Sequence, residues 1–291
     1  SVIPEGTTLL VINNGIYAER IIEIAQKFNI SVKSIHCSPY AIVSLDELTN
    51  ALLADSTIST VAMVHHETST GLLNPITEIG SLVKKHSKTF IVDAISSYAG
   101  IPIDIQKAQV DYLIATSNKC LQGIPGISFV LANIENLSKN GQNGKGFYFD
   151  LYGQYKSLEQ NNVLRFTPPV QVFYALNQAL EEYFIEGEIN RFNRYKENCH
   201  ILMQGLSDLG FTFLIQPELQ SHLLVLIKLP NELEHISFTN LHDRLYSKGF
   251  TIYPTSIRLD HAFRLACFGD INKNDIVLFL NELKTALIQL K

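Results

Sequence analysis

Short apolar runs alternate with segments of helical spacing through the first half of the chain. The runs of strand length are "TLLVINN", "SVKSIHC", "TVAMVHH", "TFIVDA", "YLIAT" and "ISFVLA". The segments with apolar residues every three or four positions are "IYAERIIEIAQKF", "SLDELTNALLA" and "ITEIGSLVKKH", which predicts helices. In the second of these, Ser44 and Glu47 have the spacing of a capping box. Near-continuous apolar strands between helices predict an α/β fold with a mostly parallel sheet and helices on both faces.

The pattern changes after residue 145. "GFYFDLYGQYKSLEQ" is rich in aromatic residues and is expected to be helical, and "RFTPPVQVFYALNQALEEYF" predicts a Pro-Pro turn and then a helix. A long helical stretch follows to Leu209, with a break expected near Gly187. The remainder predicts strands at 211–215, 223–229, 250–253 and 263–267 and helices at 238–248 and 273–290. We therefore expect a large domain over residues 1–185 and a smaller α+β domain over residues 186–291.

Composition narrows the class of protein. The 291 residues are 46% hydrophobic and 18% charged, which suits two domains with large cores and a subunit interface. The net charge of −5, without a basic tract, argues against a nucleic-acid partner. Four scattered cysteines without a C-x-x-C motif favour reduced thiols and a cytoplasmic protein. No apolar run reaches membrane-spanning length.

One lysine stands alone at the end of a predicted strand. Lys119 is the only charged residue between Asp111 and Glu135, and it follows the strand "YLIAT". Asp93 closes the preceding strand, 26 residues earlier. The loop "HHETSTG" leaves a third strand end. Because the carboxyl ends of parallel strands meet at one edge of a sheet, we expect these groups to face a common ligand.

An amine and a carboxylate in this arrangement suit pyridoxal phosphate. The cofactor needs a lysine to bind its aldehyde covalently and a carboxylate to keep its ring nitrogen protonated. A lysine in apolar surroundings can have a lowered pKa and act as nucleophile and base. The spacing alone also allows Asp93 to stabilise a loop and Lys119 to be a solvated side chain.

Other candidate sites are weaker. His65, His66 and Glu67 could suggest a metal, but adjacent histidines on a strand point to opposite faces, so no metal is expected. Cys120 is expected to be a packed small residue rather than a nucleophile. The glycines of "QGIPGISF" lack the order of a phosphate-binding loop. The aromatic residues of "FYFDLYGQY" indicate core or interface.

Four segments decide between these interpretations. "HHETSTGLLNP", "FIVDAISSYAGIPID", "YLIATSNKCLQGIPGISFV" and "RFTPPVQVFYAL" resemble the class V aminotransferases, which are fold type I pyridoxal phosphate enzymes. The resemblance runs in order along essentially the whole chain. It implies a homodimer with active sites at the subunit interface. It also implies that Lys119 binds the cofactor covalently and that Asp93 pairs with the ring nitrogen.

The resemblance implies roles for further residues. Tyr17 of "NNGIYAER" corresponds to the residue that stacks on the cofactor ring. Thr68 and Ser69 correspond to positions where a hydroxyl contacts the ring oxygen. The remaining assignments are Asn118 to cofactor binding, Thr167 to the cofactor phosphate of the neighbouring subunit, and Arg264 to the acidic group of the substrate. A guanidinium group suits both a phosphonate and a carboxylate.

Within the family, the chain most resembles enzymes that act on 2-aminoethylphosphonate and pyruvate. This implies that phosphonoacetaldehyde and alanine are formed, in phosphonate degradation. The alternatives are an alanine–glyoxylate or serine–pyruvate type of aminotransferase and a non-catalytic fragment. The family has a Gly-Ser-Gly-Thr-type turn ahead of the first strand, where a helix N-terminus binds the cofactor phosphate. This chain lacks that turn, so we expect a missing N-terminal part and weaker cofactor binding.

Overall fold

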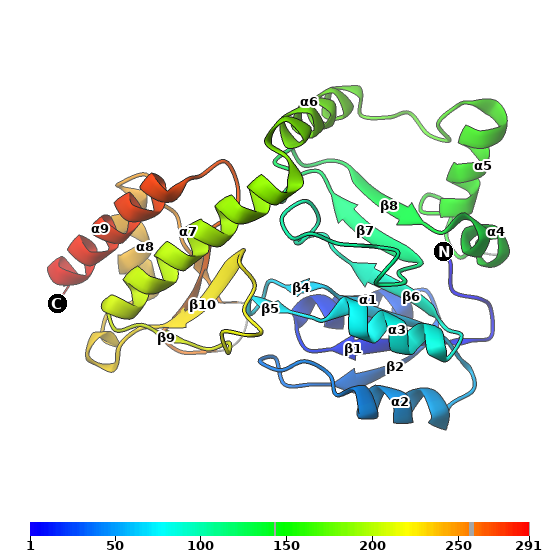
Figure 1. Ribbon diagram of the computed structural model, residues 1–291, viewed down its shortest axis with the longest axis horizontal. Coiled ribbons are helices and arrows are strands. Elements are labelled where there is room, and N and C mark those ends of the chain that lie inside the picture. Colours follow the sequence, from blue (N-terminus) through cyan, green and yellow to red (C-terminus); the bar gives the residue numbers. More distant parts are fainter. Residues whose placement is uncertain (143, 256–258, 291) are drawn as a thin grey trace.

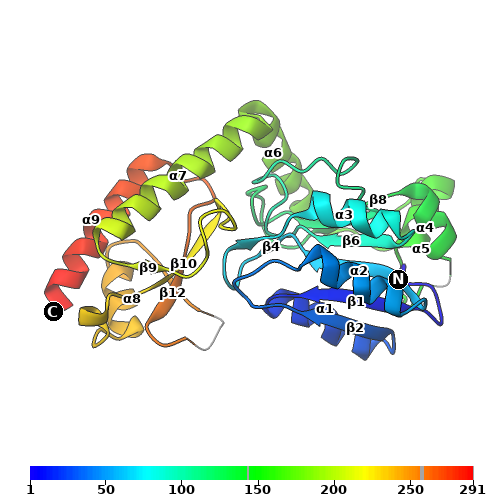
Figure 2. The ribbon, with the colours of Figure 1, turned by 60° about the horizontal axis from the view of Figure 1, so that its bottom comes forward.

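The computed structural model describes residues 1–142, 144–255 and 259–290. Figure 1 shows two parts side by side, each built around its own sheet. Two consecutive helices, α6 (Val170–Glu186) and α7 (Glu188–Asp208), join them. Figure 2 shows that α7 runs from α6 along the C-terminal part.

The larger part contains a six-stranded sheet with the order β2-β1-β3-β6-β7-β8. Every neighbouring pair is parallel except β7 and β8, so the predicted mostly parallel sheet is confirmed. The strands are β1 (Thr8–Asn13), β2 (Ser31–His36), β3 (Ile58–Val64), β6 (Thr89–Asp93), β7 (Tyr112–Thr116) and β8 (Ser128–Ala132).

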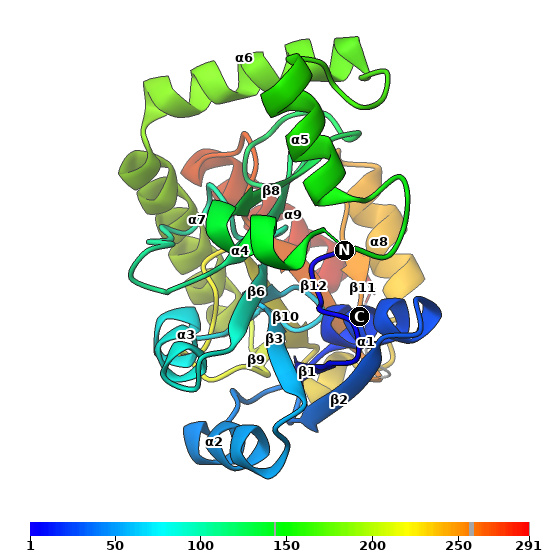
Figure 3. The ribbon, with the colours of Figure 1, turned by 90° about the vertical axis from the view of Figure 1, so that its right-hand side faces the viewer.

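Helices cover both faces of this sheet, as Figure 3 shows edge-on. They are α1 (Ile16–Lys27), α2 (Leu45–Ala54), α3 (Ile76–Lys85), α4 (Ile134–Asn140) and α5 (Leu151–Asn161). Successive strand side chains point to opposite faces. Val11 therefore packs with Ala18 of α1, whereas Ile12 belongs to the cluster that holds Leu48 of α2 and Ile79 of α3.

A short antiparallel pair lies between β3 and α3. It consists of β4 (His66–Glu67) and β5 (Leu72–Leu73), whereas the sequence predicted one strand through both histidines. Gly71 joins the pair with φ of 91°, and a Cβ atom there would lie 2.5 Å from the carbonyl oxygen of Leu224. This close approach lets the C-terminal part dock on the turn before β5.

The C-terminal part has a four-stranded antiparallel sheet with the order β11-β12-β10-β9. Side chains of α7, α8 and α9 form its core with one face of β10 and β12, around Leu206, Val225, Leu241, Phe263 and Leu283. Its further elements are β9 (Thr212–Phe213), β10 (Leu224–Lys228), a 3-10 turn (Asn231–Leu233), α8 (Phe238–Tyr246), β11 (Tyr253–Pro254), β12 (Ala262–Ala266) and α9 (Lys273–Leu290).

Several local expectations differ from the structure. Helix α2 begins directly after Ser44, but the Ser44 side chain forms no capping hydrogen bond. Helix α5 begins only at Leu151, because the Asp150 side chain accepts a hydrogen bond from the Gly153 amide and caps it there. The strand predicted at 250–253 is instead β11, since Phe250 packs against the C-terminal core. Gly187, with φ of 81°, separates α6 from α7 as predicted.

Candidate active site

Asp93 and Lys119 leave neighbouring parallel strands at the same edge of the sheet. Asp93 is the last residue of β6 and pairs in register with Ile114 of β7. The Ala94 amide then donates to the Ile114 carbonyl oxygen at 2.9 Å. Lys119 lies in the turn that follows β7, half-buried beside the buried Cys120. The topology therefore brings the amine and the carboxyl to one edge.

The carboxyl group of Asp93 is held from one side only. Burial raises the pKa of Asp93, while the Ile95 amide and the positive charge of Arg20 oppose that shift. The Ile95 amide donates to Oδ1 at 2.9 Å. Within the part of the chain that the structure describes, Oδ2 has no hydrogen-bond partner. One oxygen of a largely desolvated carboxyl group is thus free to accept a hydrogen bond.

The two adjacent histidines face different partners near this edge. Nδ1 of His65 lies 2.9 Å from Oγ of Ser97, and Nε2 of His66 lies 2.8 Å from Oγ of Ser221 in the C-terminal part. Burial and, to a smaller extent, the charge of Lys119 lower the pKa of His66 to about 4, while the backbone hydrogen bond with Ser96 opposes this shift. His66 therefore lies close enough to Lys119 to sense its charge. No cluster of metal-ligating side chains occurs among the described residues.

Tyr17 and Thr68 lie on two segments next to this edge. Tyr17 is half-buried in the first turn of α1, and the Arg20 guanidinium lies 5.1 Å from its ring centroid. The Ser69 hydroxyl donates to Oε1 of Glu67 at 2.5 Å and is fully buried. No described residue hydrogen-bonds the Thr68 hydroxyl. Of the two hydroxyls, the one on Thr68 is therefore free for a ligand.

Arg264 brings a positive charge from the C-terminal sheet to the same region. Its Nη1 donates to the Thr68 carbonyl oxygen at 2.8 Å, and its Nε donates to that of Pro254 at 3.2 Å. Among the described residues, no carboxylate forms an ion pair with Arg264. The guanidinium is thus fixed by two neutral acceptors and keeps its charge and further N–H groups for an anion.

Asn118 and Thr167 are both exposed, and of the two only Asn118 lies next to another predicted site residue. Asn118 is exposed beside Lys119, and its Oδ1 accepts a hydrogen bond from the Thr116 hydroxyl at 2.9 Å. Thr167 is exposed in the link between α5 and α6, at the top of Figure 1. No contact within the described chain joins Thr167 to Lys119, Asp93 or Tyr17. Its assignment to a neighbouring subunit stays a prediction.

Two buried charged residues near the site were given no role in catalysis or cofactor binding by the sequence. Arg191 of α7 donates from Nη1 to the carbonyl oxygen of Cys120 at 3.0 Å. The carboxyl group of Glu67 lies against the start of α1. Cys120, which Arg191 contacts, and Gly15, which Glu67 faces, are both distant in the chain, so the local sequence does not reveal these two contacts. Cys120 itself packs at 0% exposure, and burial raises the pKa of its thiol to about 12, which agrees with a packing role.

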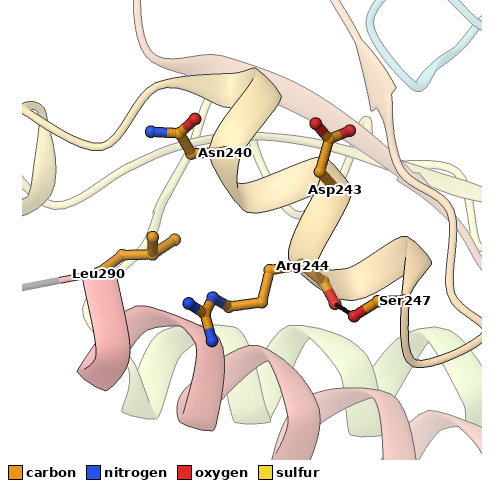
Figure 4. Close-up of a pocket in the computed structure, with 5 residues that line it drawn as sticks. All are labelled: Asn240, Asp243, Arg244, Ser247 and Leu290. Carbon is orange, nitrogen blue, oxygen red and sulfur yellow. Dashed lines mark hydrogen bonds between the residues drawn. The ribbon is translucent and has the colours of Figure 1, made fainter.

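A surface hollow lies elsewhere in the molecule. It has a volume of about 380 Å³, and Figure 4 shows Arg244 and Leu290 among the side chains that line it between α8 and α9. Asn240, Asp243 and Ser247 complete the lining. None of the predicted site residues takes part in it, so it is separate from the edge that holds Lys119.

The residues at this edge fit pyridoxal phosphate in their donor set. The free Oδ2 of Asp93 offers an acceptor for a protonated ring nitrogen, and its desolvation strengthens such a bond. The amine of Lys119 lies at the end of the next strand. The half-buried Tyr17 presents an aromatic ring, and Thr68 a free hydroxyl, on neighbouring segments.

Comparison with known proteins identifies the family. The family model "Aminotransferase class-V" matches residues 1–240. The 2-aminoethylphosphonate–pyruvate transaminase of Salmonella heidelberg is 38% identical over 285 residues, which cover 97% of this chain and 77% of that protein. The enzyme of the same name from Salmonella typhimurium is 38% identical over 281 residues, covering 96% of this chain and 76% of that protein.

Solved structures show the same fold. An alanine–glyoxylate aminotransferase from Nostoc sp. has a TM-score of 0.89 at 24% identity, covering 98% of this chain and 76% of that one. A pyridoxamine–pyruvate aminotransferase from Mesorhizobium loti has a TM-score of 0.90 at 21% identity, covering 100% of this chain and 75% of that one. The match over residues 1–240 and the 38% identity along nearly the whole chain show that it belongs to the class V aminotransferases.

Proposed function

We propose that this chain transfers the amino group of 2-aminoethylphosphonate to pyruvate with pyridoxal phosphate, giving phosphonoacetaldehyde and alanine. The observation that carries the proposal is the placement of Asp93 and Lys119 at adjacent carboxyl ends of β6 and β7. The names and the 38% identity of the Salmonella enzymes support the choice of substrates.

Asp93 and Lys119 divide the work at the cofactor. When bound, pyridoxal phosphate supplies an electron-accepting ring that stabilises the negative charge left on a substrate carbon after proton removal. Asp93 would accept a hydrogen bond from the ring nitrogen through its free Oδ2 and would keep that nitrogen protonated. Lys119 is the residue that holds the cofactor. Its Nζ then removes the proton from the carbon atom that bears the substrate nitrogen.

Tyr17, Thr68 and Arg264 orient the ligands. The ring of Tyr17 would stack on the cofactor ring, and the Thr68 hydroxyl would donate to the ring oxygen. Arg264 binds the phosphonate of the amine and the carboxylate of pyruvate in turn, because each group presents at least two oxygens on one atom, which a guanidinium can contact together. Its two contacts to backbone carbonyl oxygens restrict its motion before substrate arrives.

A homodimer completes the proposed enzyme, with Thr167 and Asn118 contributing to cofactor binding. Large apolar side chains are exposed in the segment around Thr167, including Phe149 at 71% and Tyr174 at 75% exposure. Such a concentration of exposed aromatic residues is typical of a protein interface. Thr167 then reaches the phosphate of a cofactor held mainly by the partner subunit.

The test is a product assay with the purified chain, pyridoxal phosphate, 2-aminoethylphosphonate and pyruvate. Alanine and phosphonoacetaldehyde are expected in equal amounts. Lys119→Ala should abolish both products and the visible absorbance of lysine-bound cofactor, whereas Lys107→Ala, at an exposed lysine, should leave both. Turnover by Lys119→Ala would overturn the assignment. Activity with alanine and glyoxylate alone would favour the alternative substrates, and absence of cofactor binding would favour a non-catalytic fragment.

A further inference from the structure

Glu67 is a carboxyl group buried between two segments that carry predicted cofactor contacts. Its side chain is 0% exposed. Oε1 accepts hydrogen bonds from the Ser69 hydroxyl at 2.5 Å and from the Ser69 amide at 3.2 Å. These bonds fold the loop that follows β4 back on the carboxyl group, with Thr68 in between.

The other side of the same carboxyl group lies on the start of helix α1. A Cβ atom on Gly15 would lie 2.3 Å from Cδ and 2.7 Å from Oε2 of Glu67. Only glycine therefore fits at the residue that precedes the helix. Tyr17, the predicted stacking residue, follows two positions later, within the first turn of α1.

The charge of Glu67 matches its place at the positive end of the helix. Burial raises the pKa of Glu67, and hydrogen bonds from Ser69 oppose the shift. The amides of Tyr17 and Ala18 oppose it further. They act as dipoles at longer range, because Oε2 is buried without a donor in hydrogen-bonding geometry. One carboxyl group thus attracts both segments.

We propose that Glu67 is a positioning residue that sets the distance between Tyr17 and Thr68 by joining the start of α1 to the Thr68–Ser69 loop. The role in cofactor binding rests on the proposed function. In that role the ring of Tyr17 and the hydroxyl of Thr68 address the same cofactor, so their separation must match its ring. Glu67 fixes this separation without touching the cofactor itself.

The test compares Glu67→Gln with Glu23→Gln, which changes an exposed glutamate on the same helix. The amide keeps the volume but places a donor opposite the helix amides. Hydrogen–deuterium exchange of the cofactor-free protein should become faster in both peptides 14–20 and 66–71, and remain unchanged in α9. Cofactor affinity, measured by absorbance titration, should fall about 10- to 100-fold, because Tyr17 and Thr68 are no longer preorganised at a fixed separation.

The outcomes separate the two proposals. Faster exchange in both peptides with weaker cofactor binding supports the positioning role. Exchange like that of Glu23→Gln would overturn it, and so would a uniform increase through the chain, which indicates general destabilisation. If the unsubstituted chain binds no cofactor, the proposed function fails. The exchange data still test whether Glu67 joins the start of α1 to the Thr68–Ser69 loop. If Glu67→Gln does not fold, Ser69→Ala, which removes the shortest bond to the carboxyl group, decides by the same exchange criteria.

Discussion

The guanidinium of Arg191 donates a hydrogen bond of 3.0 Å to the carbonyl oxygen of Cys120, the residue after Lys119. Arg191 is 2% exposed and also donates to Oε2 of Glu186 at 2.6 Å. The Tyr195 hydroxyl approaches the same Cys120 oxygen at 3.5 Å. The turn that carries the lysine is therefore anchored on helix α7.

Arg191→Met should destabilise the protein by about 3 kcal/mol, because it removes the buried partner of Glu186 and leaves the Cys120 carbonyl oxygen with only the long contact to the Tyr195 hydroxyl. Glu186 keeps Arg194 as a second partner, which places the effect at the lower end of the usual range. Urea unfolding measures the change. Lys196→Met, at an exposed residue of the same helix, is the control, and equal stability of the two variants would contradict the anchoring role.

Asp93→Asn should leave the fold intact and lower kcat/KM roughly a thousandfold, which corresponds to about 4 kcal/mol of transition-state stabilisation. The amide still accepts from Ile95 through its oxygen but no longer holds a proton on the ring nitrogen. Steady-state kinetics and circular dichroism check the two parts of the prediction. Asp46→Asn changes an exposed aspartate of α2 and should have no effect. Unchanged turnover by Asp93→Asn would show that the ring nitrogen has another partner.

Arg264→Lys should raise KM for the amine and for pyruvate by about 10- to 100-fold, as expected for the loss of a charge-assisted bidentate contact. A lysine cannot reach Thr68, Pro254 and an anion together. Cofactor affinity should change less than either KM. Arg244→Lys, in the hollow between α8 and α9, should behave like the unsubstituted chain. Equal KM values in the two variants would remove Arg264 from substrate binding.

The free energy of unfolding should fall as the pH drops below neutral, because His65 and His66 are buried in their neutral form. Burial lowers the pKa of His65 from 6.5 to about 3 and that of His66 from 6.5 to about 4. Their stabilising contribution is complete above pH 6.5. It decreases below that value, since the unfolded chain takes up protons that the folded chain does not. At pH 5 each histidine should lower the free energy of unfolding by about 2 kcal/mol relative to its value above pH 6.5.

Urea unfolding at pH 7, 6 and 5 measures this dependence. His66→Gln, whose amide can still hydrogen-bond Ser221, should roughly halve the histidine contribution to the slope. His235→Gln, at an exposed position, should retain the full slope. A His66→Gln slope equal to that of the unsubstituted chain would show that His66 is protonated in the folded protein.

The fold was largely predictable because its strands are short and apolar and are separated by segments with clear helical spacing or by glycine and proline residues. Gly187 marked the break between α6 and α7, and the apolar spacing of α9 gave its bounds, Lys273–Leu290. The sequence was less informative where tertiary contacts decide. The positions of β4 and β11 depend on docking between segments far apart in the chain.

The candidate site was predictable only where strand ends define it. Asp93 and Lys119 follow apolar strands, so their common edge follows from the topology. Glu67 was considered only as a metal ligand and Arg191 was not considered, because their contacts with Gly15 and with Cys120, 71 residues from Arg191, lie far away in the sequence. Local patterns carry no information on such pairs.

The hydrogen bond from Arg264 to Thr68 joins residues 196 positions apart, which fixes the order in which the site is completed during synthesis. Lys119 and Asp93 emerge from the ribosome well before Arg264. At about 5–20 residues per second, roughly 7–30 s separate Lys119 from Arg264. During that interval a nascent chain contains the lysine and the carboxyl group but lacks Arg264, the residue proposed to bind the acidic group of the substrate. Under the proposed function, recognition of the acidic group of the substrate therefore requires the last strand of the C-terminal sheet.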